Sequence, residues 1–427
     1  MKPRLIALAL AGATASALLV ACDRSTPDDT AGAPTTSTPG ATPASAPAPD
    51  PGTSTTAQTD LEQLAERLVT QSAAVKEGEI VYISGRAQDA ELLENIAVNV
   101  RKLGAWPMIG YSSDRLSKRM FFDVPDKYDA QADRVGVELA KVFDVTITLG
   151  NGTTENLFEG ADPKRMAARG KANEPVTKAF RENNIRSVEI GNDLYPTPWR
   201  AERYGMDEAA LASTFWNGVN IDYSELQTRG AQVKAALAAG NEMHITNPNG
   251  TDLRLRVQGR PVLVSDGIIS AEDIKQGGAA LSVYLPAGEV YTTPVPGTAE
   301  GKVVHTRMFY RGKQVDNLTL TIAGGKVTEM TGSGPGYADL RAEYDAVEDP
   351  RKDLFGFVDL GINSNVTLPA NTTVGTWVPA GAVTVGTGSN DWAGGDNSVP
   401  YGMTAFLPGS TVMLDGKAIV ENGVLKL

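Results

Sequence analysis

One carboxylate in the chain is placed by its neighbours where it could do chemistry. Glu289 lies in the stretch Leu285–Pro294 (LPAGEVYTTP), which follows an apolar run typical of a strand, 280–284. Pro286 fixes its own backbone angle and Gly288 permits a sharp turn, so the stretch predicts a rigid corner from which Glu289 projects. The ordinary role of a Glu beside a glycine turn is that of a solvated loop side chain.

A second carboxylate opens a similar stretch nearer the C-terminus. Asp359 begins the run DLGINSNV, residues 359–366. The two stretches resemble metal-binding segments of the M29 aminopeptidases, where a Pro-x-Gly-Glu-Val-x-Thr-x-Pro run and a Glu-Leu-Gly-Ile-Gly-x-Asn-Pro run each supply a carboxylate. The resemblance implies that Glu289 and Asp359 stand at metal-ligand positions. This chain departs from the second run, since Asp replaces Glu, and Asn363 and Val366 replace Gly and Pro. The missing methylene matters because metal–oxygen distances are held near about 2.0–2.2 Å.

The histidines that the resemblance calls for are missing. M29 enzymes are understood to hold two divalent metal ions with two Glu, two His and one Asp, and the ions polarise the peptide carbonyl and activate a bridging water. Matching the order of the motifs places Thr384 at the first His position, and Gly402 and Thr404 at the second His and the Asp. The two histidines of the chain, His244 and His305, both precede this region. The resemblance therefore implies a dismantled centre with two carboxylates left and no catalytic residue.

Other residues could rebuild a metal site. Asp391, Asp396 and Asp415 lie near the missing positions, and an all-oxygen set would suit calcium or magnesium. Loops rich in Gly, Asn and Asp are also ordinary turns. His305 is expected on a strand (GKVVHTR), where it could approach Glu289 or serve as a structural histidine with satisfied hydrogen bonds. Serine or cysteine chemistry has no support, because no G-x-S-x-G motif occurs and the only cysteine lies near the N-terminus.

The N-terminus has the features of an exported lipoprotein. A positively charged start precedes an apolar run, Leu5–Val20, that is too short for a membrane-spanning helix. The run ends in LVAC, which resembles the lipobox of bacterial lipoproteins; an ordinary cleavage site is the alternative. The resemblance implies a signal peptide over residues 1–21 and acyl chains on Cys22 that hold the protein on a membrane. Asp23 resembles the enteric signal for retention on the periplasmic face of the inner membrane.

The rest of the chain divides by composition. Residues 23–59 are almost entirely Ala, Pro, Ser, Thr, Gly and Asp, so segment 22–59 is expected to be a lipidated cysteine and a disordered tether. Over 60–215, helical periods alternate with short apolar strands such as Val145–Leu149, which predicts a parallel sheet. Residues 216–427 begin with a helix, 222–239, and an Asn-Gly hairpin, and are then rich in Val, Thr and Gly. We therefore expect an α/β fold: an N-terminal parallel-sheet α/β domain followed by a largely β C-terminal domain of the M29 aminopeptidase type.

The net charge and the absence of certain motifs argue against some classes of binding partner. The formal net charge of −12 argues against nucleic acid as a partner, and no G-x-G-x-x-G motif follows the first strand. The sequence predicts an envelope-anchored, extracytoplasmic lipoprotein, catalytically inactive and without a cofactor, whose old substrate cleft binds peptides or another protein. The alternative is a metal-dependent aminopeptidase that uses zinc, cobalt or manganese with an altered ligand set. By analogy with the M29 family, a homodimer is expected.

Overall fold

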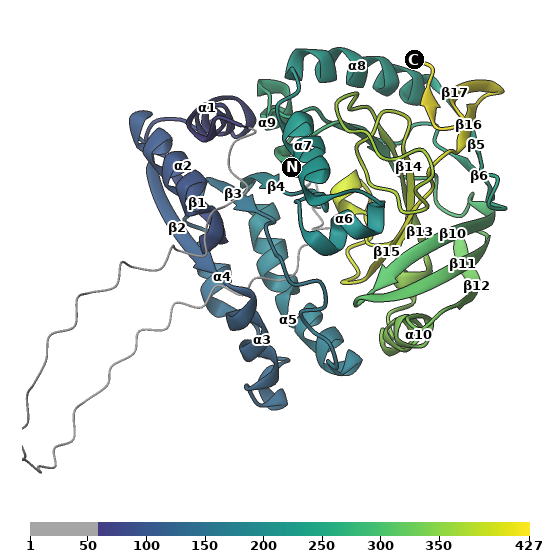
Figure 1. The fold of residues 1–427 in the computed structure, drawn as a ribbon, viewed down its shortest axis with the longest axis horizontal. Coiled ribbons are helices and arrows are strands. Elements are labelled where there is room, and N and C mark those ends of the chain that lie inside the picture. The colour runs from purple at the N-terminus through teal and green to yellow at the C-terminus, as the bar shows by residue number, and fades with distance from the viewer. Residues whose placement is uncertain (1–58) are drawn as a thin grey trace, which may run out of the picture.

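The computed structural model describes residues 59–427. The expected signal peptide, the lipobox Cys22 and the expected tether as far as residue 58 lie outside the described residues. Within residues 59–427, no helix combines the length and the apolar character needed to cross a membrane. The described chain forms an α/β part and a β-rich part that lie side by side, on the left and right of Figure 1.

The first part is built on a five-stranded sheet whose neighbouring strands all run parallel, as the sequence predicts. In spatial order the strands are β2 (Trp106–Ser112), β1 (Ile80–Arg86), β3 (Val145–Leu149), β4 (Arg186–Ile190) and β8 (Ser282–Leu285). The last of them, β8, comes from the C-terminal half of the sequence. It leads directly into the stretch that carries Glu289, so the parallel sheet helps to position that side chain.

Helices flank this sheet, and the sequence marks their ends. Asp60 caps the first helix, since its carboxylate accepts hydrogen bonds from the backbone N–H groups of Glu62 and Gln63. The helix that follows β1 ends at Lys102, two residues before Gly104. The helices of this part are α1 (Leu61–Arg67), α2 (Ala90–Lys102), α3 (Asp114–Phe122), α4 (Arg134–Leu139), α5 (Pro163–Glu182), α6 (Pro198–Tyr204) and α7 (Glu208–Val219).

The second part contains two antiparallel sheets, which confirms the largely β character predicted for it. The larger sheet contains the hairpin predicted at the Asn-Gly turn, and it has the strand order β12 (Lys326–Ser333), β11 (Lys313–Ala323), β10 (Glu300–Tyr310), β6 (Asp252–Arg256), β5 (Glu242–Thr246), β16 (Thr411–Leu414), β17 (Lys417–Glu421) and β18 (Val424–Leu425). The smaller sheet has the order β15 (Gly402–Phe406), β14 (Val383–Gly388), β13 (Phe355–Gly361), β9 (Glu289–Thr292) and β7 (Val262–Ser265).

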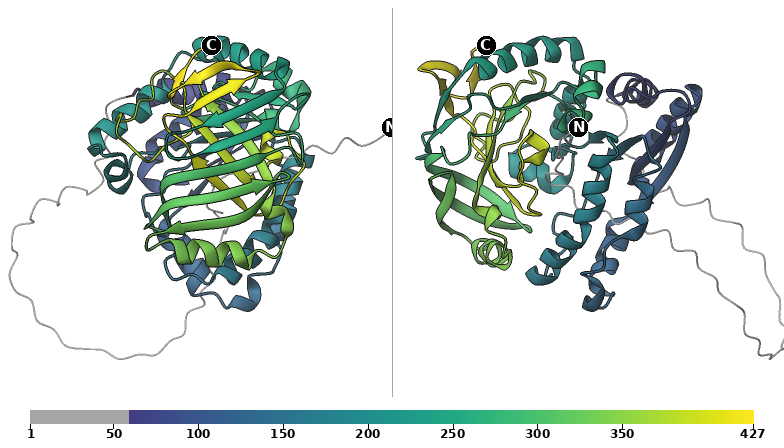
Figure 2. Two further views of the ribbon diagram at one scale, coloured as in Figure 1. Left: turned by 90° about the vertical axis from the view of Figure 1, so that its right-hand side faces the viewer. Right: turned by 180° about the vertical axis from the view of Figure 1, so that it is seen from behind.

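The two antiparallel sheets lie across one another, with the larger one in front in the left view of Figure 2. The helices of this part are α8 (Tyr223–Ala239), α9 (Ala271–Gln276) and α10 (Tyr337–Ala346). The helix predicted over 222–239 is α8, and Asp222 is its N-cap. One hydrophobic core is continuous through both parts of the chain, from Ile83 in the parallel sheet to Val358 in the smaller antiparallel sheet. The smaller sheet is therefore held between the parallel sheet and the larger antiparallel sheet, where its side chains are enclosed.

Candidate functional site

The register of the smaller sheet brings the two predicted carboxylates onto one face. Glu289 of β9 is paired with Gly361 of β13, and Tyr291 is paired with Asp359. Residues opposite one another in an antiparallel pair share a face, and so do alternate residues along one strand. Glu289, Tyr291 and Asp359 therefore project from the same side of the sheet.

The three positions that the resemblance assigns to the other metal ligands lie on this same face. Thr384 of β14 is paired with Asp359, and it is also paired with Phe406 of β15. Thr404 and Gly402 precede Phe406 by two and four residues in β15, so the strand alternation puts them on that face as well. The fold thus places on one face the five positions that the resemblance indicates, three of which carry a threonine or a glycine.

The prediction that Glu289 projects from a surface corner is wrong, because its side chain is only 3% exposed. The corner itself is present. Gly288 has φ +128°, and a Cβ atom there would stand 2.6 Å from the Cβ atom of Asn363. Asn363 in turn donates a hydrogen bond of 2.6 Å to the carbonyl oxygen of Ala287. The turn is packed against another segment in the interior, so Glu289 points into the molecule.

A loop at the carboxyl end of the parallel sheet supplies further polar groups, which the sequence reasoning missed. Asn192 follows β4, and its Nδ2 donates a 2.5 Å hydrogen bond to Oε1 of Glu289. Glu189, the penultimate residue of β4, and Asp193 line a cavity of about 30 Å³ together with Glu289. Side chains beyond the carboxyl ends of parallel strands form the binding sites of many α/β proteins. The alternation of helices and strands over 60–215 could therefore have pointed to these three residues, which lie at the end of such a strand.

Burial shifts the titration of these acids. It raises the pKa of Glu289 to about 8; the charges of Glu189 and Asp193 add to this, and the hydrogen bond from Asn192 partly offsets it. Burial, followed by the charge of Asp193, raises the pKa of Glu189 to about 7. Burial also raises the pKa of Asp359 well above its ordinary value, and the charge of Glu289 raises it further. At neutral pH the cluster therefore retains protons that free carboxylates would lose.

Aromatic rings pack over the sheet face that carries the ligand positions. Trp392 lies with its ring centroid 4.6 Å from that of Phe357 and 5.1 Å from that of Tyr291. Trp377 lies 5.2 Å from Phe406 and 6.1 Å from Trp392, measured in the same way. Phe357, Tyr291 and Phe406 belong to the sheet face itself, as their pairings show. We call these five side chains the aromatic cluster.

The remaining donors on this face do not fit a two-metal centre. Among residues 59–427, neither oxygen of the Asp359 carboxylate has a hydrogen-bond partner, and the same holds for the hydroxyl of Thr384. The described residues contain no group of three or more His, Cys, Asp or Glu side chains arranged to hold a metal ion. Two ions with an open position for water need more donors than Glu289 and Asp359 provide.

The other residues considered from the sequence are dispersed. His305 is buried on β10, with its ring centroid 6.3 Å from that of Phe406. Neither of its ring nitrogens has a partner in the described part of the chain, so the prediction of a satisfied histidine is wrong; burial lowers its pKa to about 4. Asp391 is paired with Arg181, and Asp396 is exposed. Asp415 accepts hydrogen bonds from two backbone N–H groups near β5, as a turn residue does.

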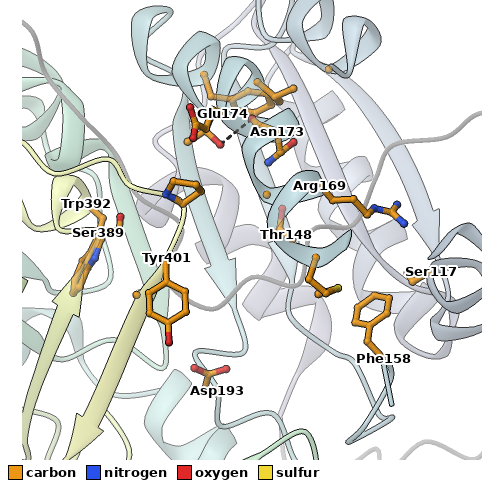
Figure 3. Close-up of a pocket in the computed structure, with 18 of the residues that line it drawn as sticks. Ser117, Thr148, Phe158, Arg169, Asn173, Glu174, Asp193, Ser389, Trp392 and Tyr401 are labelled. Carbon is orange, nitrogen blue, oxygen red and sulfur yellow. Dashed lines mark hydrogen bonds between the residues drawn. The ribbon is translucent and has the colours of Figure 1, made fainter. Parts of the chain in front are cut away.

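A large cleft of about 2590 Å³ runs between the two parts of the chain. Figure 3 shows Arg169, Asn173 and Glu174 projecting from α5 on one side, with Tyr401 and Trp392 on the other. Two residues, Asp193 and Trp392, line both this cleft and the small cavity beside Glu289. The acidic cavity is therefore adjacent to the cleft.

Comparison with known proteins places this arrangement in a family. A family model described as thermophilic metalloprotease (M29) matches residues 57–335. The chain belongs to the M29 family. Aminopeptidase PepS of Streptococcus thermophilus is 24% identical over 306 residues, which are 64% of this chain and 70% of PepS. The predicted M29 aminopeptidase-like character is thus confirmed, and M29 is a metallopeptidase family whose active members need a divalent metal.

Solved structures bear out the predicted fold class. AmpT from Thermus thermophilus superimposes with a TM-score of 0.65 at 18% identity, covering 86% of this chain and 99% of AmpT. A 2,5-dihydroxypyridine dioxygenase from Pseudomonas putida superimposes with a TM-score of 0.55 at 15% identity, covering 86% of this chain and 96% of the dioxygenase. A dioxygenase thus shares the fold of AmpT, so the chemistry of this chain has to be argued from its own side chains.

Proposed function

We propose that this M29 protein is a non-catalytic peptide-binding protein of the cell envelope. The observation that carries the proposal is the sheet face on which the ligand positions meet. Thr384, Gly402 and Thr404 stand where the family's resemblance calls for two His and one Asp, and the aromatic cluster fills the adjoining space. Without a tightly held metal ion, a water molecule keeps a pKa far above neutral, and no Lewis acid polarises a peptide carbonyl.

The cleft supports a binding role that needs no metal. Its volume of about 2590 Å³ exceeds the ~300–1,000 Å³ of an ordinary small-molecule pocket, so it has room for an extended segment of several residues. The sheet face that it exposes carries hydroxyl groups, among them Ser84 and Thr148, which hydrogen-bond each other at 3.1 Å. Asn173 of α5 adds an amide group to the lining of the cleft (Figure 3). Mixed donors and acceptors of this kind complement the N–H and C=O groups of a peptide backbone.

Peptide binding is tested by narrowing the cleft. Asn173 is exposed on α5 and lines the cleft, so Asn173→Trp should reduce the volume without disturbing the core. The full-length protein in detergent is titrated against a fluorescent pentapeptide library. We expect Asn173→Trp to weaken binding by about tenfold, which is about 1.4 kcal/mol. Lys171→Trp, on the same helix but outside the cleft lining, is the matched control. Equal binding by both variants would exclude the cleft as the peptide site.

The envelope location rests on the lipobox. We propose that acyl chains on Cys22 anchor the protein and that the segment after it separates the folded part from the membrane. A single acyl chain binds membranes only weakly, whereas two or more hold a protein firmly. The proposal is supported by the sequence LVAC following an apolar run.

A working aminopeptidase is the second candidate. The name of the relative PepS and the family description favour it, and so does the grouping of Glu189, Asp193 and Glu289 around one cavity. Metal analysis together with a broad screen of aminoacyl-amide substrates separates the two candidates. Tightly bound metal and turnover of any such substrate would favour the aminopeptidase.

A further inference from the structure

The large cleft differs in charge from the chain as a whole. The formal net charge of the chain is −12, whereas eight Arg and Lys side chains line the cleft against seven Asp and Glu side chains. An anionic ligand approaching most of the surface is repelled, and the cleft does not add to that repulsion. The cleft is therefore the part of this acidic protein that is best suited to a ligand with negative charge.

A helix and a strand bring three arginines together in the cleft lining. Arg203 of α6 has its guanidinium carbon 3.8 Å from the ring centroid of Phe309 on β10, so the two elements are in contact there. Arg200 lies on the same helix, and the guanidinium carbons of Arg200 and Arg203 lie 4.3 and 4.7 Å from the ring centroid of Trp199. Arg307 precedes Phe309 by two residues, so the two share a face of β10. We call Arg200, Arg203 and Arg307 the arginine cluster.

Two members of the arginine cluster have hydrogen-bond donors that the protein does not use. Within residues 59–427, Arg200 forms no ion pair, and its side chain donates one hydrogen bond, from Nη1 to the carbonyl oxygen of Tyr195. Asp193 acts on Arg200 only through space. The other N–H groups of Arg200 are not buried, so they are open to the cleft. Arg307 is exposed and donates no hydrogen bond in the described part of the chain; its Nε lies 3.5 Å from Oδ1 of Asp316.

A buried histidine next to Arg307 also lacks a partner. His305 lies two residues before Arg307 on β10, so their side chains share a face, about 6–7 Å apart along the strand. His305 lines the cleft and is 3% exposed, and neither ring nitrogen has a hydrogen-bond partner among residues 59–427. Polar atoms buried without a partner are rare in native proteins, and an absent ligand or water is a common reason. The neutral imidazole has one N–H that it can donate to an anion.

The guanidinium group favours a particular kind of anion. It presents parallel N–H groups that match the two oxygens of a carboxylate, and such charge-assisted hydrogen bonds are stronger than neutral ones. Stacking on Trp199 orients the guanidinium of Arg200, and the indole is itself held by a 3.0 Å hydrogen bond from its Nε1 to the carbonyl oxygen of Thr153. A group that is oriented in advance loses less conformational freedom when it binds a ligand.

We propose that the arginine cluster, together with His305, binds a carboxylate group of a peptide that lies in the cleft. The proposal rests on the proposed function, because the peptide is the ligand inferred for this cleft. It adds that a negative charge on the peptide is recognised and names the side chains that recognise it. A C-terminal carboxylate and the side chain of Asp or Glu carry the same chemical group, so the test has to separate these two sources.

Four probes test the proposal by isothermal titration of the full-length protein in detergent. They are N-acetyl-tetra-alanine with a free C-terminal carboxylate, the same peptide as its C-terminal amide, that amide with one Ala replaced by Glu, and glutarate. We expect at least one of the two peptides that carry a carboxylate to bind about tenfold more tightly than the tetra-alanine amide. The peptide that does so identifies the source of the carboxylate.

Substitutions in the arginine cluster should remove this preference. Arg307→Gln should reduce it to less than about threefold and weaken glutarate binding by about tenfold. The position tolerates the change because Arg307 is exposed and donates no hydrogen bond in the described part of the chain. Arg200→Gln should act in the same direction, and a urea melt checks its folding. Arg254→Gln, exposed on β6 and outside the cleft lining, is the matched control and should leave binding unchanged.

The outcomes separate this proposal from the proposed function. Equal binding of the three peptides, or a preference for carboxylates that survives in both cluster variants, would overturn the carboxylate site and leave peptide binding intact. Binding of glutarate that is lost in Arg307→Gln, without binding of any peptide, would support the site and refute the peptide role. If none of the probes binds, both proposals fail.

Discussion

Glu289→Gln should stabilise the protein at neutral and alkaline pH. The substitution keeps the shape of the side chain and an oxygen that can accept the hydrogen bond from Asn192, while it removes the ability to ionise. Glu289 is buried with a pKa of about 8, against 4.5 for an ordinary Glu. When folding raises the pKa of an acid, the acid ionises in the unfolded chain at a lower pH than in the folded protein. Above that pH it therefore reduces the free energy of unfolding.

The sign and size of this change in the free energy of unfolding follow from proton binding in the folded and unfolded states. Below pH 4.5 both states hold the proton, so Glu289 imposes no penalty; between 4.5 and about 8 only the folded state holds it, and stability falls as the pH rises. At about 1.4 kcal/mol per pH unit, the difference gives a ceiling of about 5 kcal/mol at pH 8. Water entering the cavity would relieve part of the burial penalty, so we expect a gain of about 2–3 kcal/mol for the Gln variant.

Urea unfolding followed by tryptophan fluorescence, at about pH 5, 6, 7 and 8, measures this directly. The free energy of unfolding of Glu289→Gln should exceed that of the wild type by an amount that grows steadily with pH. Glu348→Gln, at an exposed position, should show no such trend. A Gln variant that is less stable than the wild type at pH 8 would refute the reasoning. That result would mean that Glu289 is ionised in the folded protein and matched by a bound cation.

Three further predictions concern the aromatic cluster and the N-terminal segment. Trp392→Ala should cost about 3–5 kcal/mol of unfolding free energy in a thermal or urea melt, because Trp392 is 4% exposed and packs on two rings; a loss below 1 kcal/mol would contradict a filled site. Cys22→Ala should abolish incorporation of labelled fatty acid and release the protein from membranes, and continued labelling would exclude the lipobox. Mild proteolysis should remove residues 23–59 first and leave one fragment that starts near Asp60 with unchanged unfolding, whereas earlier cleavage within 60–150 would contradict the boundary.

The sequence predicted the architecture well because its local signals agree with the packing. Asp60 and the Asn-Gly turn near residue 250 mark element ends by hydrogen-bonding rules that tertiary contacts do not override. The alternation of helices and strands likewise required a parallel sheet. The sequence could not predict that β8, which lies far along the chain, completes that sheet, since strand order depends on long-range pairing.

The surroundings of Glu289 and Asp359 were not predicted from the sequence. Motif spacing placed Glu289 and Asp359 at ligand positions, and the strand register does bring them onto one face. The burial of Glu289 could not be read from its neighbours, because the enclosing groups come from distant segments. Asn192 follows β4, and Trp392 lies about a hundred residues beyond Glu289. Proximity of that kind is a property of the whole fold, and a Pro-x-Gly turn has the same local sequence inside a protein as at its surface.

The central claim is that the M29 centre of this chain no longer holds its metal ions. The most direct test loads the purified protein with zinc, cobalt or manganese, dialyses it, and measures the retained metal together with hydrolysis of aminoacyl amides. We predict less than one ion per chain and no hydrolysis that Glu289→Gln abolishes, because the resemblance leaves only Glu289 and Asp359 as ligands and the described residues contain no cluster of three or more such side chains. Two tightly held ions per chain, with activity lost in Glu289→Gln, would contradict the account and identify a working aminopeptidase.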